Sequence, residues 1–237
     1  MQIRLVDPLL EALRLITSGD LYVWNVILRS LQISGSALLL AMVIGLPIGI
    51  AVGLTRFRLR LPVVAVINAG LAFPPVVVGL GVFLLLSRAG PLGDLQLLYT
   101  PAAMIGAQAI LAGPYIAAVS LAAVENIPPD IALQARALGA SRRQAILLQL
   151  REVRTSLVAA VAAGFGAIIS EVGAVMMVGG NILGETRVMT TAIVLETRRG
   201  NFDVAIAMGI VLMLIALCVN ALLLLLGRRS IRRGLVA

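Results

Sequence analysis

Long uninterrupted runs of apolar residues dominate this chain of 237 residues and leave few folds open to it. A helix needs about 20 predominantly apolar residues to cross the hydrocarbon core of a bilayer. Several such runs follow one another here, and 60% of all residues are hydrophobic while only 13% are charged. Soluble domains carry roughly twice that charged fraction. The sequence therefore predicts an all-α, polytopic bundle of transmembrane helices in the inner (plasma) membrane.

Five spans are expected, and prolines interrupt two of them. The expected boundaries are 33–54, 64–86, 102–124, 156–177 and 204–226. The first span is open to extension back toward Leu21, Pro74 and Pro75 break the second, and Pro114 lies inside the third. Prolines are tolerated inside a span because neighbouring helices satisfy the freed backbone groups.

The hydrophobic pattern also divides the chain into three parts. We expect an N-terminal amphipathic segment at 1–30 that lies on the membrane interface, a transmembrane domain at 31–227, and a basic tail at 228–237. The pattern at 5–15 is typical of an interfacial helix, and a sixth, shorter span is the alternative.

Arginine placement predicts the orientation, since all nineteen basic residues are arginines. Twelve of them lie with only three carboxylates in one alternating set of loops, whereas the other segments hold seven arginines and eight carboxylates. Loops rich in arginine stay in the cytoplasm. With five spans, the N-terminus is then outside and the C-terminus is cytoplasmic. The arginines are expected to meet membrane lipid rather than nucleic acid, because aromatic residues make up only 4% of the chain.

Residues that usually carry catalysis are scarce. Histidine is absent and Cys218 is the only cysteine, so the commonest general base and metal ligand are missing. No Gly-x-x-x-x-Gly-Lys-Ser/Thr phosphate-binding motif occurs, since the chain has no lysine. We expect no catalytic residue, no metal and no cofactor bound by this chain. A gradient-driven secondary transporter is a second class, but it usually shows ionisable groups at mid-membrane and inverted repeats.

The arginine-rich loop at 125–154 predicts two short helices joined by a sharp corner. Two prolines followed by Asp130 indicate a helix over 131–138 with Asp130 as its N-cap. Gly139 is expected to end this helix at positive φ, and Ser141 is expected to cap a second helix. Such a corner suits docking into a partner's groove. The alternative is an ordinary connection whose arginines meet anionic lipid.

The stretch from 170 to 200, on the opposite side, is rich in glycine and threonine. Turns are expected at Gly179–Asn181 and at 184–187. Threonine hydroxyls, backbone N–H groups and a single guanidinium are donors that suit an oxyanion. The candidate residues of a translocation path are Glu171, Gly179, Gly180, Asn181, Thr186, Arg187, Thr190 and Thr191. Two other interpretations remain open: a capped loop in which Thr190 and Thr191 start a helix, and an Arg187 that pairs with Glu185 or Glu171.

The loop at 125–154 resembles the coupling loop of ABC importer permeases. That family's pattern is Glu-Ala-Ala, three residues, Gly, nine residues, then Ile-x-Leu-Pro. The matching residues are Ala137, Leu138, Gly139, Ala140 and Ser141, after an Ile-Pro-Pro-Asp lead-in. Leu133-Gln134-Ala135 and Gln149-Leu150-Arg151-Glu152 depart from the two flanking motifs. The resemblance implies that Gln134, Ala135, Arg136, Leu138, Gly139, Ala140 and Ser141 dock into a cytoplasmic ATPase.

The other motifs are similar to molybdate and tungstate permeases, the tungstate type in particular. They are Ala72–Leu80, Ser87–Gly93, Thr100–Ile105, Ser170–Gly173, Val178–Ile182 and Thr186–Ile193. Ala167 departs from the arginine expected there. The resemblance spans most of 30–225 and implies a permease subunit of an ATP-driven importer for an oxyanion, tungstate or else molybdate. Its implied partners are two ATP-binding subunits that consume the ATP, an extracytoplasmic oxyanion-binding protein and a second copy of the chain, with Gly164 and Gly166 allowing close approach.

Overall fold

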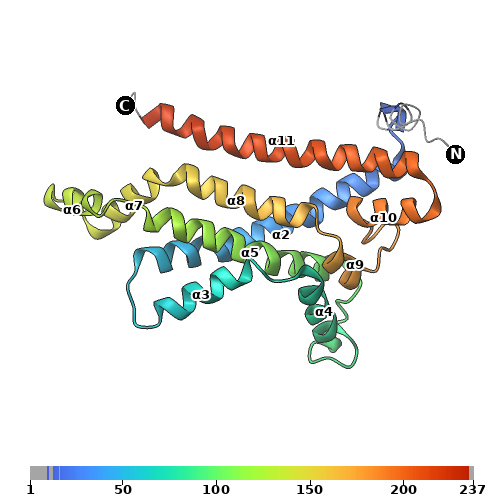
Figure 1. Cartoon of the computed structure of the whole chain (residues 1–237), viewed down its shortest axis with the longest axis horizontal. Coiled ribbons are helices and arrows are strands. Elements are labelled where there is room, and N and C mark those ends of the chain that lie inside the picture. Colours follow the sequence, from blue (N-terminus) through green and yellow to red (C-terminus); the bar gives the residue numbers. More distant parts are fainter. Residues whose placement is uncertain (1–9, 11–12, 16, 235–237) are drawn as a thin grey trace.

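The fold is entirely helical within the residues that the structure describes, a computed structural model covering Leu10, residues 13–15 and residues 17–234 (Figure 1). The main helices are α2 (Leu21–Leu54), α3 (Arg60–Gly70), α4 (Pro75–Leu86), α5 (Pro101–Glu125), α6 (Pro129–Ala137), α7 (Arg142–Glu152), α8 (Arg154–Ile169), α9 (Gly173–Gly179), α10 (Met189–Arg199) and α11 (Phe202–Gly234), with a short 3-10 turn at Gly93–Leu95. Most of the predicted interfacial helix at 5–15 lies outside the described residues.

The number of spans agrees with the sequence-based prediction. Three helices are each long and apolar enough to cross a membrane, and the count reaches five if α3 with α4 and α7 with α8 are each one bent span. The first span does extend back to Leu21. The backbone of the predicted basic tail, as far as Gly234, continues α11 as one helix.

The centre of the bundle is the contact between α2 and α5, which glycines bring close together. Gly45, Gly49 and Gly53 recur every fourth residue on α2 and therefore share one face. A Cβ on Gly49 would lie 2.4 Å from the carbonyl oxygen of Ala117, and one on Gly53 would lie 2.8 Å from the Cβ of Val124. Small residues allow such close approach between membrane helices. The helix α5 also packs on α8, where a Cβ on Gly164 would lie 2.7 Å from the Cγ1 of Ile116.

The second span is sharply broken, as its prolines predict. The axes of α3 and α4 differ by 100°. Pro74 is the N-cap residue of α4 and Pro75 is its first residue, where the missing N–H costs no hydrogen bond. Figure 1 shows α4 standing away from the long helices. It packs on α9, where a Cβ on Gly79 would lie 2.6 Å from the Cα of Ala174.

The fourth span differs from the prediction of one helix over 156–177, which is wrong. The helix α8 ends at Ile169, and α9 begins only at Gly173. The Ser170 hydroxyl donates to the carbonyl of Gly166, and the Glu171 carboxylate accepts the N–H of Ala174. These local bonds replace helical ones at the break. At its other end, α8 meets α7 with a bend of 62° at Val153.

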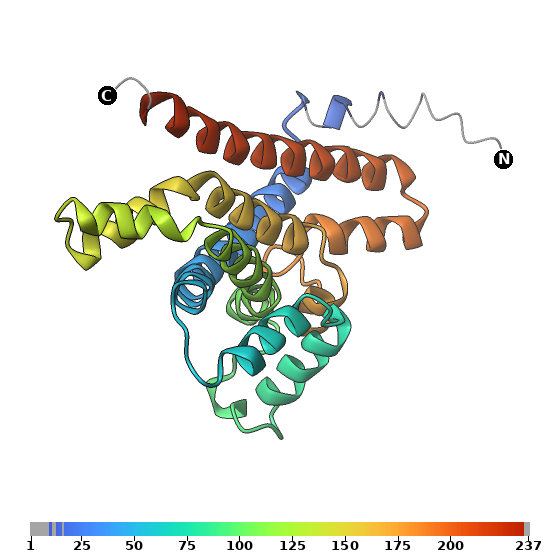
Figure 2. The ribbon, with the colours of Figure 1, turned by 60° about the vertical axis from the view of Figure 1, so that its left-hand side comes forward.

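Two regions therefore extend from opposite ends of the bundle (Figures 1 and 2). One is the corner, which we define as α6, α7 and the residues between them, 129–152. The other is the threonine stretch, which we define as residues 170–191 and which leads into α10.

Candidate functional site

The corner is fixed by its own backbone and by one cap. Gly139 has φ of +88°, a left-handed conformation that residues with a Cβ rarely adopt. The N–H of Ala140 donates to the carbonyl of Ala135 over 3.0 Å, which closes the end of α6. The Ser141 N–H donates to the Gln144 side chain over 2.7 Å, and the Gln144 N–H donates back to the Ser141 hydroxyl. This reciprocal capping box starts α7.

One prediction at the corner is wrong in detail. Pro128, not Asp130, occupies the N-cap position of α6, and no side-chain hydrogen bond caps that helix. The rigid φ of Pro128 and Pro129 already sets the first turn. Asp130 lies inside this turn, where its negative charge interacts favourably with the positive end of the helix dipole.

The tip of the corner exposes apolar side chains. Leu138 is 88% exposed and Leu133 is 66% exposed. Gln134, Arg136 and Gly139 are also exposed, Ala140 is partly exposed, and Ala135 is buried. Two exposed leucines on neighbouring turns of a short helix mark a surface that a partner can cover.

The threonines of the other region are all engaged internally. Thr186 donates to the carbonyl of Gly179 and accepts the N–H of Ile182. Thr191 accepts the N–H of Val188 over 3.1 Å and thereby caps α10. Thr190 donates to the carbonyl of Glu171 over 2.9 Å, across the break between α8 and α9. All three threonines are buried, so their hydroxyls hold the shape of the stretch.

Glycine and asparagine form the predicted turns. Gly180 has φ of +67°, Asn181 of +55° and Gly184 of +79°. Gly179 lies directly against Met104, whose sulfur a Cβ there would meet at 2.6 Å. Gly180 is exposed and Asn181 is partly exposed.

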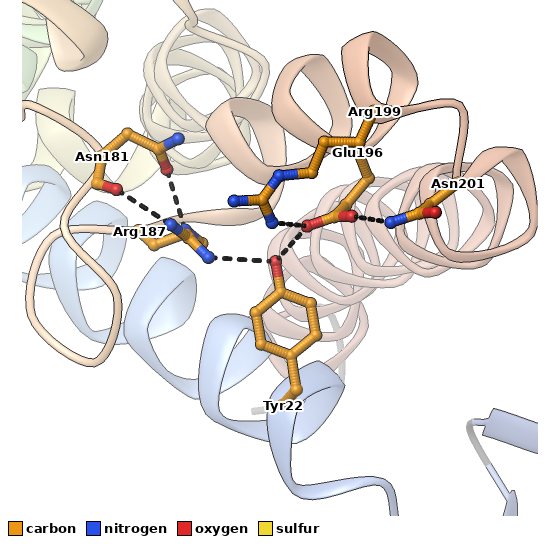
Figure 3. A network of polar contacts seen from close by, with 6 residues as sticks. All are labelled: Tyr22, Asn181, Arg187, Glu196, Arg199 and Asn201. Carbon is orange, nitrogen blue, oxygen red and sulfur yellow. Dashed lines mark hydrogen bonds and ion pairs between the residues drawn. The ribbon is translucent and has the colours of Figure 1, made fainter.

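Arg187 binds neither of the carboxylates that the sequence suggested. Its Nε and Nη2 donate to the side chain and the backbone carbonyl of Asn181, over 3.2 and 3.3 Å. Its Nη1 donates to the Tyr22 hydroxyl over 3.4 Å, and the guanidinium carbon lies 5.9 Å from the centre of the Tyr22 ring. Figure 3 shows Arg187 between Asn181 and Tyr22. Arg187 therefore joins the turn to the start of α2.

The same network ends on a buried carboxylate. Glu196 is only 4% exposed, and it accepts hydrogen bonds from Tyr22 at 3.0 Å and from Asn201 at 2.8 Å (Figure 3). Arg199 pairs with it at 3.3 Å. Burial acts to raise the pKa of Glu196, but the bonds from Asn201 and Tyr22 and the charges of Arg199 and Arg187 outweigh it and lower that pKa. The carboxylate thus stays ionised and holds α2, α10 and the turn before α11 together.

A family model supplies the decisive comparison. The model described as "Binding-protein-dependent transport system inner membrane component" matches residues 45–232, from α2 to the end of α11. The chain belongs to this family. It is thus a permease: a multi-pass, membrane-embedded transport component of an ABC importer.

Curated relatives and solved structures agree with this assignment. A "Probable anion ABC transporter permease protein" of Haloferax volcanii is 46% identical, with 86% of this chain and 91% of the relative covered. The "Tungstate uptake system permease protein TupB" of Peptoclostridium acidaminophilum is 42% identical over 90% of this chain and 93% of its own. The crystal structure of a bacterial ABC transporter that imports alginate matches with a TM-score of 0.71 at 21% identity, covering 86% of this chain and 78% of that one.

Sequence reasoning missed three residues that shape this permease. Tyr22 and Glu196 lie 174 positions apart, so no local pattern reveals their bond. Glu196 does follow Met189 and Ala192 at helical spacing, a register that signals burial. Gln108 is the third: it is 2% exposed within α5, and its amide donates to the carbonyl of Ile168 over 3.2 Å. A buried polar side chain within a span is itself a signal of a specific role.

Proposed function

We propose that this permease is the membrane-spanning subunit of an ATP-driven importer for a small oxyanion, with tungstate as the preferred cargo. The observation that supports tungstate as the cargo is the 42% identity, over nearly the whole of both chains, to a protein named as a tungstate uptake permease. Molybdate is the second candidate, because it has almost the same size and charge. ATP hydrolysis belongs to a separate subunit, since this chain has no phosphate-binding lysine motif.

The corner is the proposed docking element for that ATP-binding subunit. Support comes from the exposed Leu133 and Leu138 beside the rigid turn at Gly139. An apolar tip on a short helix fits a hydrophobic groove. In this proposal the corner lies in the cytoplasm, as the arginine distribution predicts, and two such subunits would serve a permease of two copies.

The threonine stretch is proposed to border the outer part of the translocation path. Its threonines fix the wall, while Ser170, Gly180 and residues 182–185 are exposed and Asn181 is partly exposed. Weak, neutral donors suit passage, because an ion that is held strongly does not leave. The extracytoplasmic binding protein would then deliver its anion to this end of the bundle.

A second copy of the chain is proposed to supply the opposite wall. The space beside Gly164 is already occupied by Ile116 of the same chain, whereas a Cβ on Gly166 would meet nothing within 4 Å. Gly166 is therefore the glycine of α8 with room for another helix. Cross-linking through a cysteine at position 166 in intact membranes tests this: a trapped dimer supports it, and monomer alone contradicts it.

Uptake measurements test the cargo. Cells that lack the permease gene are complemented with the chain, its ATP-binding subunit and its binding protein, and uptake of tungstate is measured alone and with excess molybdate or sulfate. We expect tungstate uptake that requires all three components and that sulfate barely reduces. Uptake that persists without the ATP-binding subunit and follows an ion gradient would contradict the proposal.

A further inference from the structure

A cavity of about 750 Å³ lies between the corner and the adjacent ends of the long helices. The ends of α2 and α5 and the start of α3 form one side, while α6 and α7 form the other. Its polar lining consists chiefly of Arg56, Arg60, Arg136, Arg142, Glu125 and Gln149. The exposed tip residues Leu133 and Leu138 are not part of it. Docking at the tip therefore leaves this cavity unexplained.

The cavity carries an excess of positive charge. Glu125 is its only carboxylate, and it pairs with Arg60, whose Nε also donates to the carbonyl of Val52. Arg56, Arg136 and Arg142 form no ion pair with any residue in the described part of the chain. Three like charges that face one space repel each other, and an anion with several oxygens between them would relieve this.

A separate apolar groove lies farther along the same three helices. It has a volume of about 490 Å³ and is lined on α2 by Ile44 and Ile48, on α3 by Val66 and Gly70, and on α5 by Gly113, among others. On α2 the groove ends at Ile48 and the basic cavity begins at Ala51, which is about 4.5 Å farther along a helix. On α3 the step from Val66 to Arg60 is about 9 Å. On α5 the step from Ala117 to Val124 is about 10.5 Å. The groove and the basic cavity thus lie within about 11 Å of each other along each of the three helices.

We propose that the basic cavity and the groove together bind one anionic phospholipid, with its phosphate among the arginines and an acyl chain between α2, α3 and α5. The surroundings fit a membrane interface: Leu61, next to Arg60, is 80% exposed, and Phe57 and Leu59 beside it are exposed as well. Basic pockets between the cytoplasmic ends of membrane helices suit anionic headgroups. A free anion would use the cavity but not the groove, whereas a phospholipid has a phosphate for the cavity and an acyl chain for the groove.

The position of this site gives the bound lipid a structural role. Its phosphate touches both the ends of the long helices and the corner, because Arg56 belongs to the first and Arg142 to the second. The lipid therefore fastens α6 and α7 to the membrane core. Loss of the lipid would loosen the corner and reduce coupled transport without removing the ATP-binding subunit's contact surface.

Matched arginine pairs test the headgroup site. Arg56→Gln with Arg142→Gln removes two charges from the cavity, whereas Arg58→Gln with Arg143→Gln removes two charges from the same segments outside its lining. The full chain, purified with its partner subunits, is placed in nanodiscs of phosphatidylglycerol or phosphatidylcholine, and retained lipid is counted by native mass spectrometry after detergent transfer. We expect one retained phosphatidylglycerol per chain, retained about tenfold less in the first pair and unchanged in the second. Equal loss in both pairs would overturn the proposal, since it would reflect general surface charge.

Two further arms separate the other occupants. Gly113→Leu fills the groove, because a Cβ there meets nothing within 4 Å, and we expect it to reduce phosphatidylglycerol retention severalfold while the number of chains in the complex stays the same. A complex that falls apart instead would show that a second copy covers the groove. Glycerol 3-phosphate or inorganic phosphate that displaces phosphatidylglycerol at millimolar concentration would show a free-anion site. Either result would refute the lipid assignment.

Discussion

The corner leaves an apolar tip in the open, whereas the threonine stretch uses its polar side chains in bonds within the chain. At the corner, Leu138 is almost fully exposed, and only backbone bonds and one capping box hold the turn. In the stretch, Thr186, Thr190 and Thr191 are buried and hydrogen-bonded, and Arg187 has two partners. The corner thus presents an exposed apolar surface, while bonds within the chain fix the shape of the stretch. Changes at the corner should affect assembly, and changes in the stretch should affect stability and rate.

The largest effect is expected from Gly139→Val. A β-branched residue at φ of +88° is strained by roughly 1–2 kcal/mol or more, so the corner should reorganise and retention of the ATP-binding subunit should fall about tenfold. Copurification from membranes measures this. Gly139→Asn is the matched control, since asparagine tolerates the left-handed region. If the valine variant retains its partner as well as the asparagine variant does, the corner is not the docking element.

Leu138→Asp should have the next largest effect, for a different reason. The side chain is exposed, so the melting temperature of the permease itself should not change. The acidic group would, however, enter the hydrophobic groove proposed for the ATP-binding subunit. We expect retention of the ATP-binding subunit to fall about fivefold. A parallel loss of thermal stability would mean that Leu138 packs within the chain, contrary to its exposure in the structure.

In the threonine stretch, Thr190→Val removes the bond across the break between α8 and α9. The carbonyl of Glu171 then lacks its partner, which should cost about 1 kcal/mol and lower the melting temperature by about 3 °C. Tungstate uptake should slow while the complex still assembles. Thr190→Ser keeps the hydroxyl and should behave like the parent. Parental stability and uptake in the valine variant would place the path elsewhere.

The smallest effect is expected from Glu196→Gln, measured against pH. The pKa of Glu196 lies below its ordinary 4.5, so ionised Glu196 stabilises the fold above that pH, and this contribution is lost as pH falls toward the lowered pKa. At neutral pH the variant should melt about 2 °C lower than the parent. This difference should shrink as the pH is lowered past 4.5. A difference that stays constant with pH would show that the charge is unimportant.

The same contrast explains which features could be predicted from the sequence. The apolar runs, the turn at Gly139, the cap at Ser141 and the break at Pro74 depend on residues close together in the chain, and all were predicted. The break after Ile169 was not, because the side chains that satisfy its carbonyls, Gln108 and Thr190, come from α5 and α10. Pairing of Arg187 with Glu185 or Glu171 was one interpretation of the sequence, yet its partner Tyr22 lies 165 positions away. Features that depend on neighbouring residues can be predicted from the sequence, whereas pairs of residues far apart in the chain depend on how the helices pack.

Val153 alone separates α7 from α8, and this has a mechanical consequence. It is at once the C-cap residue of α7 and the N-cap residue of α8, so no longer loop between them can absorb motion. With about 1.5 Å of rise per residue, α7 is about 16 Å long and α8 about 24 Å, so a rigid tilt of about 10° at this joint would move their far ends by about 3 and 4 Å. The far end of α8 is Ile169, whose neighbour Ile168 is held by Gln108. A force that acts on the corner at the far end of α7 would therefore be transmitted through α8 to the place where the fourth span is broken.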